Sequence, residues 1–332
     1  MMKKLINSVE SIVDEMLLGY VAAHGDRIAL ASNTRIVVRK EQKLATKVAL
    51  IIGNGSGHEP IAMGWIGEGL LDGNIVGEIF AAPAPELILE GIKTVNNEAG
   101  VLLLVSSHSG DIINADVAVE EALNLGINVK SLLMYDDVSS APKGEEHERR
   151  GAPGTTFIYK ILGAGAEQGQ DIHALFDLGV RVRDSIRTLG VAVAPGTSPL
   201  TGSPMFELEE NEIFIGMGVH GEPGLGRRKM GPVQEIVSEV MEIIMDDLPF
   251  AAGDNVIAMI NGSGGTTLME LLIIYKEVSS FLAKKNITIF KPLVGEMVTT
   301  QEMAGFSISL LKTDEEIRKL WAAPSSAPYF HL

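Results

Sequence analysis

Four short apolar runs occupy the first half of the chain, and each ends in a polar or glycine-rich loop; they cover 47–52, 75–80, 101–105 and 129–134. Runs of this length, bounded by loop residues, are typical of buried strands. Helices are predicted after the second and third runs, at 85–94 and 114–125. Because strands that alternate with helices imply right-handed crossovers, the pattern predicts a parallel sheet and an α/β fold.

The alternation continues after a polar stretch at 136–154, which we expect to be an exposed loop. Helices are predicted at 155–168, 172–189 and 232–246, with two more that end near 285 and 321. Strands are predicted at 191–194, 212–217, 255–260, 287–290 and 307–311. With 332 residues the chain is long enough for about two domains. We predict two α/β domains, each a sheet flanked by helices, over 1–189 and 190–332.

Composition excludes several classes of protein. The net charge of −16 argues against direct nucleic-acid binding, which needs a basic surface. Because the chain has no cysteine, disulfides, thiolate catalysis and thiolate-bound zinc are excluded. No apolar run approaches the roughly 20 residues of a membrane span. The N-terminal residues 1–16 are predicted to form an amphipathic helix without signal-peptide features, so we expect a cytoplasmic protein.

Three loops follow predicted strands of the first half, at 53–60, 81–85 and 106–111. In parallel α/β sheets, ligands bind at the carboxyl ends of the strands, so these loops are the candidate site. The first loop, GNGSGHEP, lacks the lysine and Ser/Thr of a P-loop and is only a weak nucleotide signal. A second glycine-rich turn, NGSGGTT at 261–267, fits either a helix cap at Thr266 or Thr267 or a ligand contact.

Two histidines lie in similar phrases, His58 in GNGSGHEP and His220 in GMGVHGEPG. A neutral imidazole in a glycine-rich loop can act as a base or a nucleophile. Asp111 fits either a helix N-cap or a carboxylate that orients a hydroxyl or a histidine, and His108 is ambiguous. Together these residues suggest a site for one small polar molecule. No histidine pair has the spacing of an HExxH site, so we predict no metal.

Several segments together resemble the substrate-binding subunit of dihydroxyacetone kinase (the DhaK-like family), and the resemblance runs from Lys3 to about Ala323. They are GNGSGHEP (53–60), SGDIIN (109–114), YDDV (135–138), ERRGAPGT (148–155), GVHGEPG with Arg227 and Arg228 (218–228) and GFSISLLK (305–312). The resemblance implies two α/β domains and a homodimer that binds dihydroxyacetone. No cofactor is implied on this chain, because the nucleotide, ADP or ATP, sits on a separate subunit recharged through the phosphotransferase system.

The resemblance also implies roles for individual residues. His220 would hold the ketone as a covalent hemiaminal, Asp111 would be the general base, and His58 would assist the hydroxyl. Gly53 and Gly55 would approach the ligand through their backbone. An imidazole that adds to a carbonyl would also select short-chain ketoses over glycerol, which has no carbonyl.

The chain departs from the family pattern around the ligand. Ser106 stands where the family has a lysine and His108 where it has a tyrosine; Asn54 replaces a glycine, and alanines at 82 and 84 replace hydroxyl residues. Loss of a substrate-binding cation costs several kcal/mol of transition-state stabilisation. A chain that keeps His220 but alters these neighbours resembles the family's regulatory paralogue, a dihydroxyacetone-responsive coactivator that pairs with a TetR-type regulator. Because Asp111 and His58 are present, the alternative is an active kinase subunit for dihydroxyacetone or a related ketose such as erythrulose.

Overall fold

The computed structural model describes residues 4–31, 34–41 and 45–332, and the chain divides into two compact units. The first unit comprises Met1–Met134, Phe157–Arg181 and Lys319–Leu332, and the second Tyr135–Thr156 and Val182–Arg318. These units differ from the continuous domains 1–189 and 190–332 that we expected. Residues 157–181 lie in the first unit, as in the expected division, but 135–156 and 182–189 belong to the second unit, because residues 186–194 pair as a strand in its sheet. The C-terminal residues 319–332 return to the first unit, where the Ser326 amide donates a 3.0 Å hydrogen bond to the carbonyl of Glu68. The two-sheet α/β class is as predicted.

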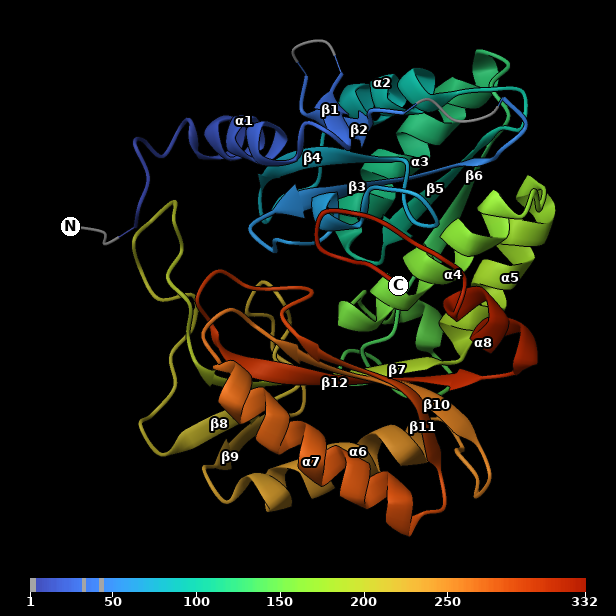
Figure 1. Ribbon diagram of the computed structural model, residues 1–332. Helices are drawn as coiled ribbons and strands as arrows, with labels where there is room; N and C mark the ends of the chain where they lie inside the picture. Colours follow the sequence, from blue (N-terminus) through green and yellow to red (C-terminus); the bar gives the residue numbers. More distant parts are fainter. Residues whose placement is uncertain (1–3, 32–33, 42–44) are drawn as a thin grey trace. The chain divides into compact units, whose positions relative to one another are not determined.

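The first unit contains a six-stranded sheet in the order β1-β2-β4-β3-β5-β6 (Figure 1). Its strands are β1 (Ile28–Leu30), β2 (Ile36–Arg39), β3 (Ala49–Ser56), β4 (Gly73–Ile79), β5 (Val101–Ser106) and β6 (Val129–Met134). The last four are the predicted strands, and they pair in parallel. The short β1 and β2, which the sequence did not predict, extend the sheet in antiparallel fashion.

Helices α2 (Pro85–Val95) and α3 (Ser109–Asn124) cover one face of this sheet. Ala49 and Ile51 belong to the hydrophobic core under these helices. Leu50 and Ile52 are also buried, and because side chains alternate along a strand they point to the opposite face. A strand buried on both faces must be apolar throughout, which explains the uninterrupted runs in the sequence.

Three predicted boundaries were wrong. The N-terminal helix, expected at 1–16, is α1 (Ile12–His24); residues 4–11 are not helical, and 1–3 lie outside the described residues. Helix α3 begins at Ser109 rather than 114, since its acidic Asp111 suits the positive end of a helix despite Gly110. Helix α5 (Ile172–Asp184) ends early because the following residues pair with β12 as strand β7 (Ile186–Ala194), and pairing overrides local preference.

The second unit contains another six-stranded sheet, in the order β11-β10-β12-β7-β8-β9. Its other strands are β8 (Glu212–Ile215), β9 (Gly226–Lys229), β10 (Asn255–Gly262), β11 (Thr288–Gly295) and β12 (Ala304–Thr313). Only β10 and β11 pair in parallel; the other neighbours are antiparallel. Helices α6 (Val233–Asp247) and α7 (Leu268–Lys284) share one hydrophobic core with the sheet. The unpredicted β9 forms a ribbon with β8, and the loop between them carries His220.

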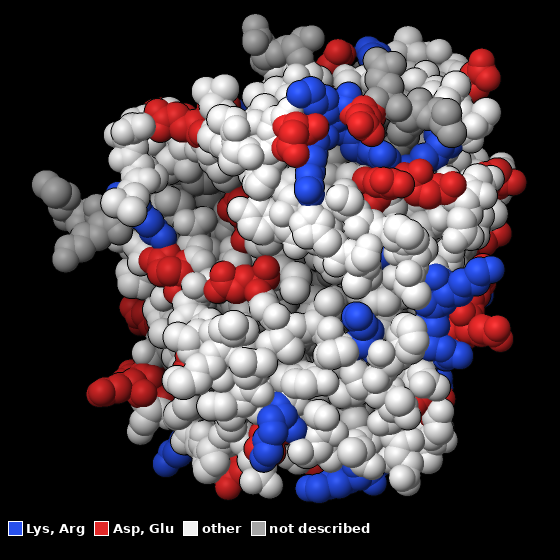
Figure 2. All heavy atoms as spheres, in the orientation of Figure 1, with Lys and Arg blue, Asp and Glu red and all other residues white. Residues whose placement is uncertain are grey.

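The remaining helices are α4 (Thr156–Glu167), α8 (Glu315–Trp321) and the short 3-10 turns Met63–Trp65, Glu146–Glu148 and Pro153–Thr155. Among the described residues, none of the helices combines the length and apolar character needed to cross a bilayer. Figure 2 shows basic side chains scattered among acidic ones on the visible face, without a broad continuous basic area.

Candidate functional site

The three predicted loops of the first unit lie together at the carboxyl edge of β3, β4 and β5. A Cβ on Gly55 would come within 2.8 Å of Ala81 N, and one on Gly53 within 3.1 Å of Pro83. Asn114, in α3, donates a hydrogen bond of 2.9 Å to the carbonyl of Pro83. The first two loops therefore touch through glycine backbone that no side chain could replace without displacement, and the third is tied to the second.

Asn54 gives this edge a polar group that a glycine would lack. Its Nδ2 donates to the carbonyl of Gly55 at 2.8 Å, which fixes the orientation of the amide because a carbonyl can only accept. Its Oδ1 is buried and accepts no hydrogen bond from any described residue. A ligand hydroxyl could donate to this oxygen, and that is the role open to Asn54 in a ligand site.

His58 is held by packing in the first loop. The side chain is 6% exposed, and its ring lies 4.9 Å from the ring of Phe80, centroid to centroid. Gly57 has φ +99°, and a Cβ there would come within 2.7 Å of Phe80, so only glycine fits. Burial raises the pKa of Glu59, which accepts a 2.9 Å hydrogen bond from the Gly57 amide. The imidazole of His58 is thus confined at the sheet edge.

The third loop joins three of the predicted residues. Ser106 Oγ lies 3.1 Å from Nδ1 of His108, and the same nitrogen lies 3.8 Å from Oδ2 of Asp111. Because serine and aspartate meet the same ring nitrogen, they cannot form a Ser-His-Asp relay, which uses opposite nitrogens. Asp111 is not the N-cap of α3, since His108 holds that position; Asp111 lies in the first turn, where the helix favours its negative charge.

His220 lies in the second unit, in the loop between β8 and β9. The Gly218 amide donates to the carbonyl of Glu222 at 2.9 Å, and the Gly221 amide donates to that of Gly218 at 3.0 Å. Thr300 Oγ1 donates to the carbonyl of Val219 at 2.9 Å. These bonds hold the backbone around His220 in one conformation, with Gly221 at φ +84°.

Glu222 is the partner of His220 that the sequence did not predict. Its Oε1 lies 2.8 Å from Nδ1 of His220, and its Oε2 accepts a 2.8 Å hydrogen bond from the His220 amide. Burial opposes ionisation of Glu222, but its hydrogen bond to His220 and the charge of that ring outweigh it and hold the pKa at about 2. The repeated phrase offered a signal, because a glutamate before proline follows the histidine in both copies.

The polar stretch 136–154 is not only an exposed loop, as we expected. Its middle is largely exposed, but Asp136, Asp137 and Arg149 are buried at its two ends. Asp137 accepts hydrogen bonds from Arg150 Nε at 3.1 Å and Nη2 at 2.8 Å. A charged run can be buried when its members pair with each other, and the sequence alone cannot show that pairing.

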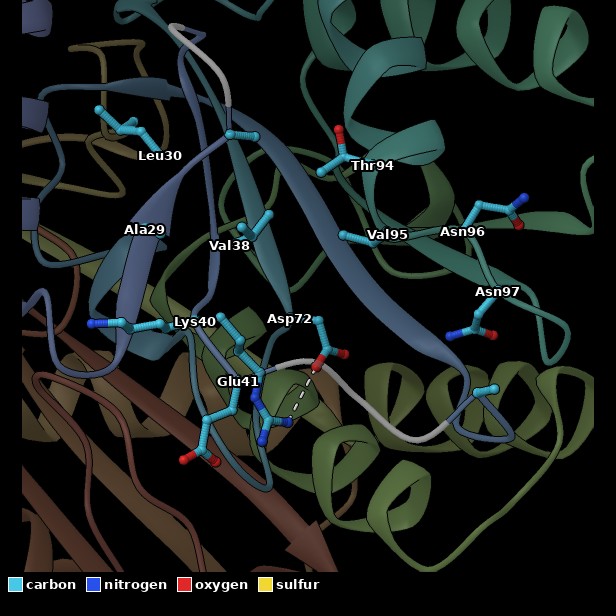
Figure 3. Close-up of a pocket in the computed structure, with 13 residues that line it drawn as sticks. Ala29, Leu30, Val38, Lys40, Glu41, Asp72, Thr94, Val95, Asn96 and Asn97 are labelled. Atoms are coloured by element: carbon cyan, nitrogen blue, oxygen red, sulfur yellow. Dashed lines mark hydrogen bonds and ion pairs between the residues drawn. The ribbon is translucent and has the colours of Figure 1, made fainter.

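A second glycine-rich turn and a pocket lie outside the loops that carry the candidate site residues. In NGSGGTT, Thr267 caps α7 in a capping box with Glu270, so the helix-cap interpretation explains this turn without a ligand. A pocket of about 590 Å³ lies in the first unit at the opposite, amino edge of the sheet (Figure 3). Asp72, which precedes β4, lines it beside Arg39 at 3.3 Å. None of the predicted site residues lines this pocket.

The family is shown by comparison with known proteins. The Dak1 domain model matches residues 18–329, and the chain belongs to that family.

Individual relatives match over the whole chain. A protein of Listeria innocua named PTS-dependent dihydroxyacetone kinase 2, dihydroxyacetone-binding subunit DhaK, is 36% identical over 332 residues, 100% of both chains. The corresponding PEP-dependent subunit of Escherichia coli is 36% identical over 98% of both chains. Among solved structures, a dihydroxyacetone kinase operon co-activator superposes with a TM-score of 0.89 and 31% identity, covering 95% of this chain and 97% of that one.

Proposed function

We propose that this protein binds dihydroxyacetone and that His220 captures the ketone covalently as a hemiaminal. The observation that carries the proposal is the His220 loop, in which a carboxylate and a fixed backbone hold the imidazole. Family membership supports it, since relatives that match the full chain are named dihydroxyacetone-binding subunits. An imidazole nitrogen adds to a ketone but not to glycerol, so capture would select for the carbonyl.

We assign the ligand's hydroxyl groups to the first unit. Asp111 and His58 would accept or share their protons, and Gly53 and Gly55 would contact the ligand through backbone. Asn54, Ser106 and His108 are the substrate-binding positions where the chain departs from the family. The buried oxygen of Asn54 supports its assignment as an added hydrogen-bond acceptor.

The regulatory form of this function is our first choice. We propose that the loaded protein acts as a coactivator with a TetR-type regulator of the dihydroxyacetone kinase operon. Ser106 and His108 support it, because they contact each other at 3.1 Å and neither supplies the fixed charge of a lysine. The structural similarity to the operon co-activator also supports it. The same proposal includes a cytoplasmic homodimer without direct contact to nucleic acid or membrane.

An active kinase subunit is the second candidate. It is favoured by the presence of both Asp111 and His58 at one sheet edge and by the 36% identity to kinase subunits. D-erythrulose kinase of Mycolicibacterium smegmatis, 35% identical over 99% of this chain, suggests a related ketose as substrate. In this form the nucleotide would sit on a separate ADP-carrying subunit.

One assay separates the candidates. The chain is mixed with the ADP-carrying subunit and phosphotransferase components of its own organism, and phosphorylation of dihydroxyacetone is followed beside a genuine kinase subunit. We expect no turnover from this chain, while binding of dihydroxyacetone is retained by the wild type and lost in His220→Ala. Turnover close to the control would establish the kinase and overturn the regulatory form; binding unchanged by His220→Ala would overturn covalent capture.

A further inference from the structure

The contacts of Glu222 decide which nitrogen of His220 carries a proton. Its carboxylate is ionised, since the pKa is about 2, and an ionised carboxylate can only accept hydrogen bonds. The 2.8 Å contact between Oε1 and Nδ1 therefore requires a hydrogen on Nδ1. In the neutral ring the lone pair then belongs to Nε2. The tautomer is set by this pair of residues, both in the second unit.

The backbone conformation of the loop brings the Glu222 carboxylate to the His220 ring. Gly221, at φ +84°, turns the chain so that the carboxylate returns to the histidine two residues earlier. Gly218 lies beside it, and a Cβ there would come within 2.2 Å of Glu222 Oε2 and 2.7 Å of Arg150 Nη1. Only glycine leaves room for both charged groups.

The ion pair of Arg150 is with Asp137, although its Nη1 lies beside Gly218 together with Glu222 Oε2. Arg150 pairs with Asp137 at 2.8 Å, and its Nη2 also lies 3.4 Å from the carbonyl of Gly216. Asp137 is itself anchored by the amide and hydroxyl of Ser139 at 2.9 and 2.6 Å. Because Asp137 compensates the guanidinium, the negative charge of Glu222 remains available to His220.

We infer that Glu222 is the positioning residue for ketone capture: it holds His220 as the Nδ1–H tautomer, directs Nε2 at the carbonyl carbon, and stabilises the positive ring that forms. The inference rests on the proposed function and deepens it. It concerns ligand capture and applies equally to the regulatory protein and to the kinase subunit.

The step balances without a further reagent. The Nε2 lone pair forms the bond to the carbonyl carbon, and the carbonyl π electrons move to oxygen. The ring then carries a positive charge, with its Nδ1–H facing Glu222, while the new alkoxide takes a proton from water. The ring keeps its Nδ1–H against Glu222, so the adduct is a hemiaminal with a positively charged ring, and the one proton that is consumed comes from solvent. A carboxylate at Nδ1 lowers the energy of the charged ring, as in triads where a carboxylate orients a histidine.

The test uses the full-length protein and two nuclear magnetic resonance readouts. Dihydroxyacetone labelled with ¹³C at the carbonyl reports the adduct, because that carbon becomes tetrahedral when captured. Protein labelled with ¹⁵N in histidine reports the tautomer of His220, with His220→Ala to assign its signals. Glu222→Gln removes the charge, Glu222→Asp keeps it at a shorter reach, and Glu210→Gln is the matched control at an exposed position of the same unit.

We expect the wild type and Glu210→Gln to show the Nδ1–H tautomer and the adduct. Glu222→Gln should show mixed tautomers and at least a tenfold lower adduct fraction at equal ligand, and Glu222→Asp should recover part of both. If Glu222→Gln kept the tautomer and the adduct, the inference would be overturned. If the wild type showed the Nδ1–H tautomer but no adduct, ketone capture itself would be overturned while the control of the tautomer by Glu222 stood.

Discussion

The two regions that carry the candidate site residues are built in different ways. In the second unit, the His220 loop is fixed by backbone hydrogen bonds and by two pairs of charged side chains, the half-buried Glu222 with His220 and the more deeply buried Arg150 with Asp137. In the first unit, the third loop carries Ser106 and His108, whose side chains contact each other. The residue that we propose to capture the ketone is thus firmly held, while residues near the proposed general base differ from the family pattern. This difference is what a ligand sensor requires, because sensing needs capture and not turnover.

The largest effect is expected from the charge pair behind the His220 loop. Arg150→Ala would leave Asp137 buried without its cation and should lower the free energy of unfolding by about 3 kcal/mol. Urea denaturation measures this as a shift of the midpoint at constant slope. Arg227→Ala, which removes an exposed partner of Glu212, is the control and should change stability by less than about 1 kcal/mol. Equal losses of stability in Arg150→Ala and Arg227→Ala would contradict a stabilising role for the buried Arg150–Asp137 pair.

Gly218→Ala tests how closely the loop is packed. The new methyl group would collide with Glu222 and Arg150, so the hydrogen bonds of the carboxylate to His220 should weaken. A loss of about 2 kcal/mol corresponds to roughly 30-fold weaker binding of dihydroxyacetone, measured by calorimetry. Gly231→Ala is the matched control, because its nearest neighbour would be 3.6 Å away, at the far end of Glu235. Unchanged affinity in Gly218→Ala would show that the loop tolerates movement.

The altered loop of the first unit can be restored toward the family pattern. The double change Ser106→Lys and His108→Tyr returns a cation and a phenol beside Asp111. If their absence limits catalysis, phosphorylation with an ADP-carrying subunit should rise to at least about tenfold above the background seen with the wild-type chain, or roughly 1.4 kcal/mol. The control is Ser106→Ala with His108→Ala, which should give no rise. No gain in the restored variant would show that these two positions do not limit phosphorylation.

The smallest effect is a pH dependence from Glu222. Its pKa is about 2 in the folded protein against an ordinary value of 4.5. A lowered carboxyl pKa contributes stability above pH 4.5 that is lost as the pH falls toward 2. Between pH 7 and pH 4 this amounts to at most about 1 kcal/mol, because solvent screens a partly exposed group. The thermal unfolding midpoints of the wild type and Glu222→Gln should converge as the pH falls. A constant difference between them would contradict the stabilising role of the ionised Glu222 carboxylate.

Much of the fold could be read from the pattern of apolar residues. The central strands β3 and β5 were predicted because burial on both faces favours apolar runs, and β4 and β6 because shorter apolar stretches end in loop residues. The short strands β1, β2 and β9 were missed, since a strand of three or four residues leaves almost no periodic signal. The predicted boundary at 189 and 190 missed that 135–156 and 182–189 belong to the second unit and that the C-terminal residues 319–332 return to the first, because these exchanges depend on contacts between segments far apart in the sequence.

The sequence by itself determined the α/β class, the strand-end position of the loops and the two histidine phrases, because periodicity and glycine spacing are local properties of the chain. The roles of His220, Asp111 and His58 stay predictions until ligand capture is measured. Only the tertiary structure decided which charges meet. The Glu222 carboxylate lies within hydrogen-bonding distance of the His220 ring because the loop turns back on itself. Arg150 and Asp137 are thirteen positions apart in the sequence, and they pair because the chain between them folds back. Pairing between side chains depends on distances in space, and residue order does not encode those distances.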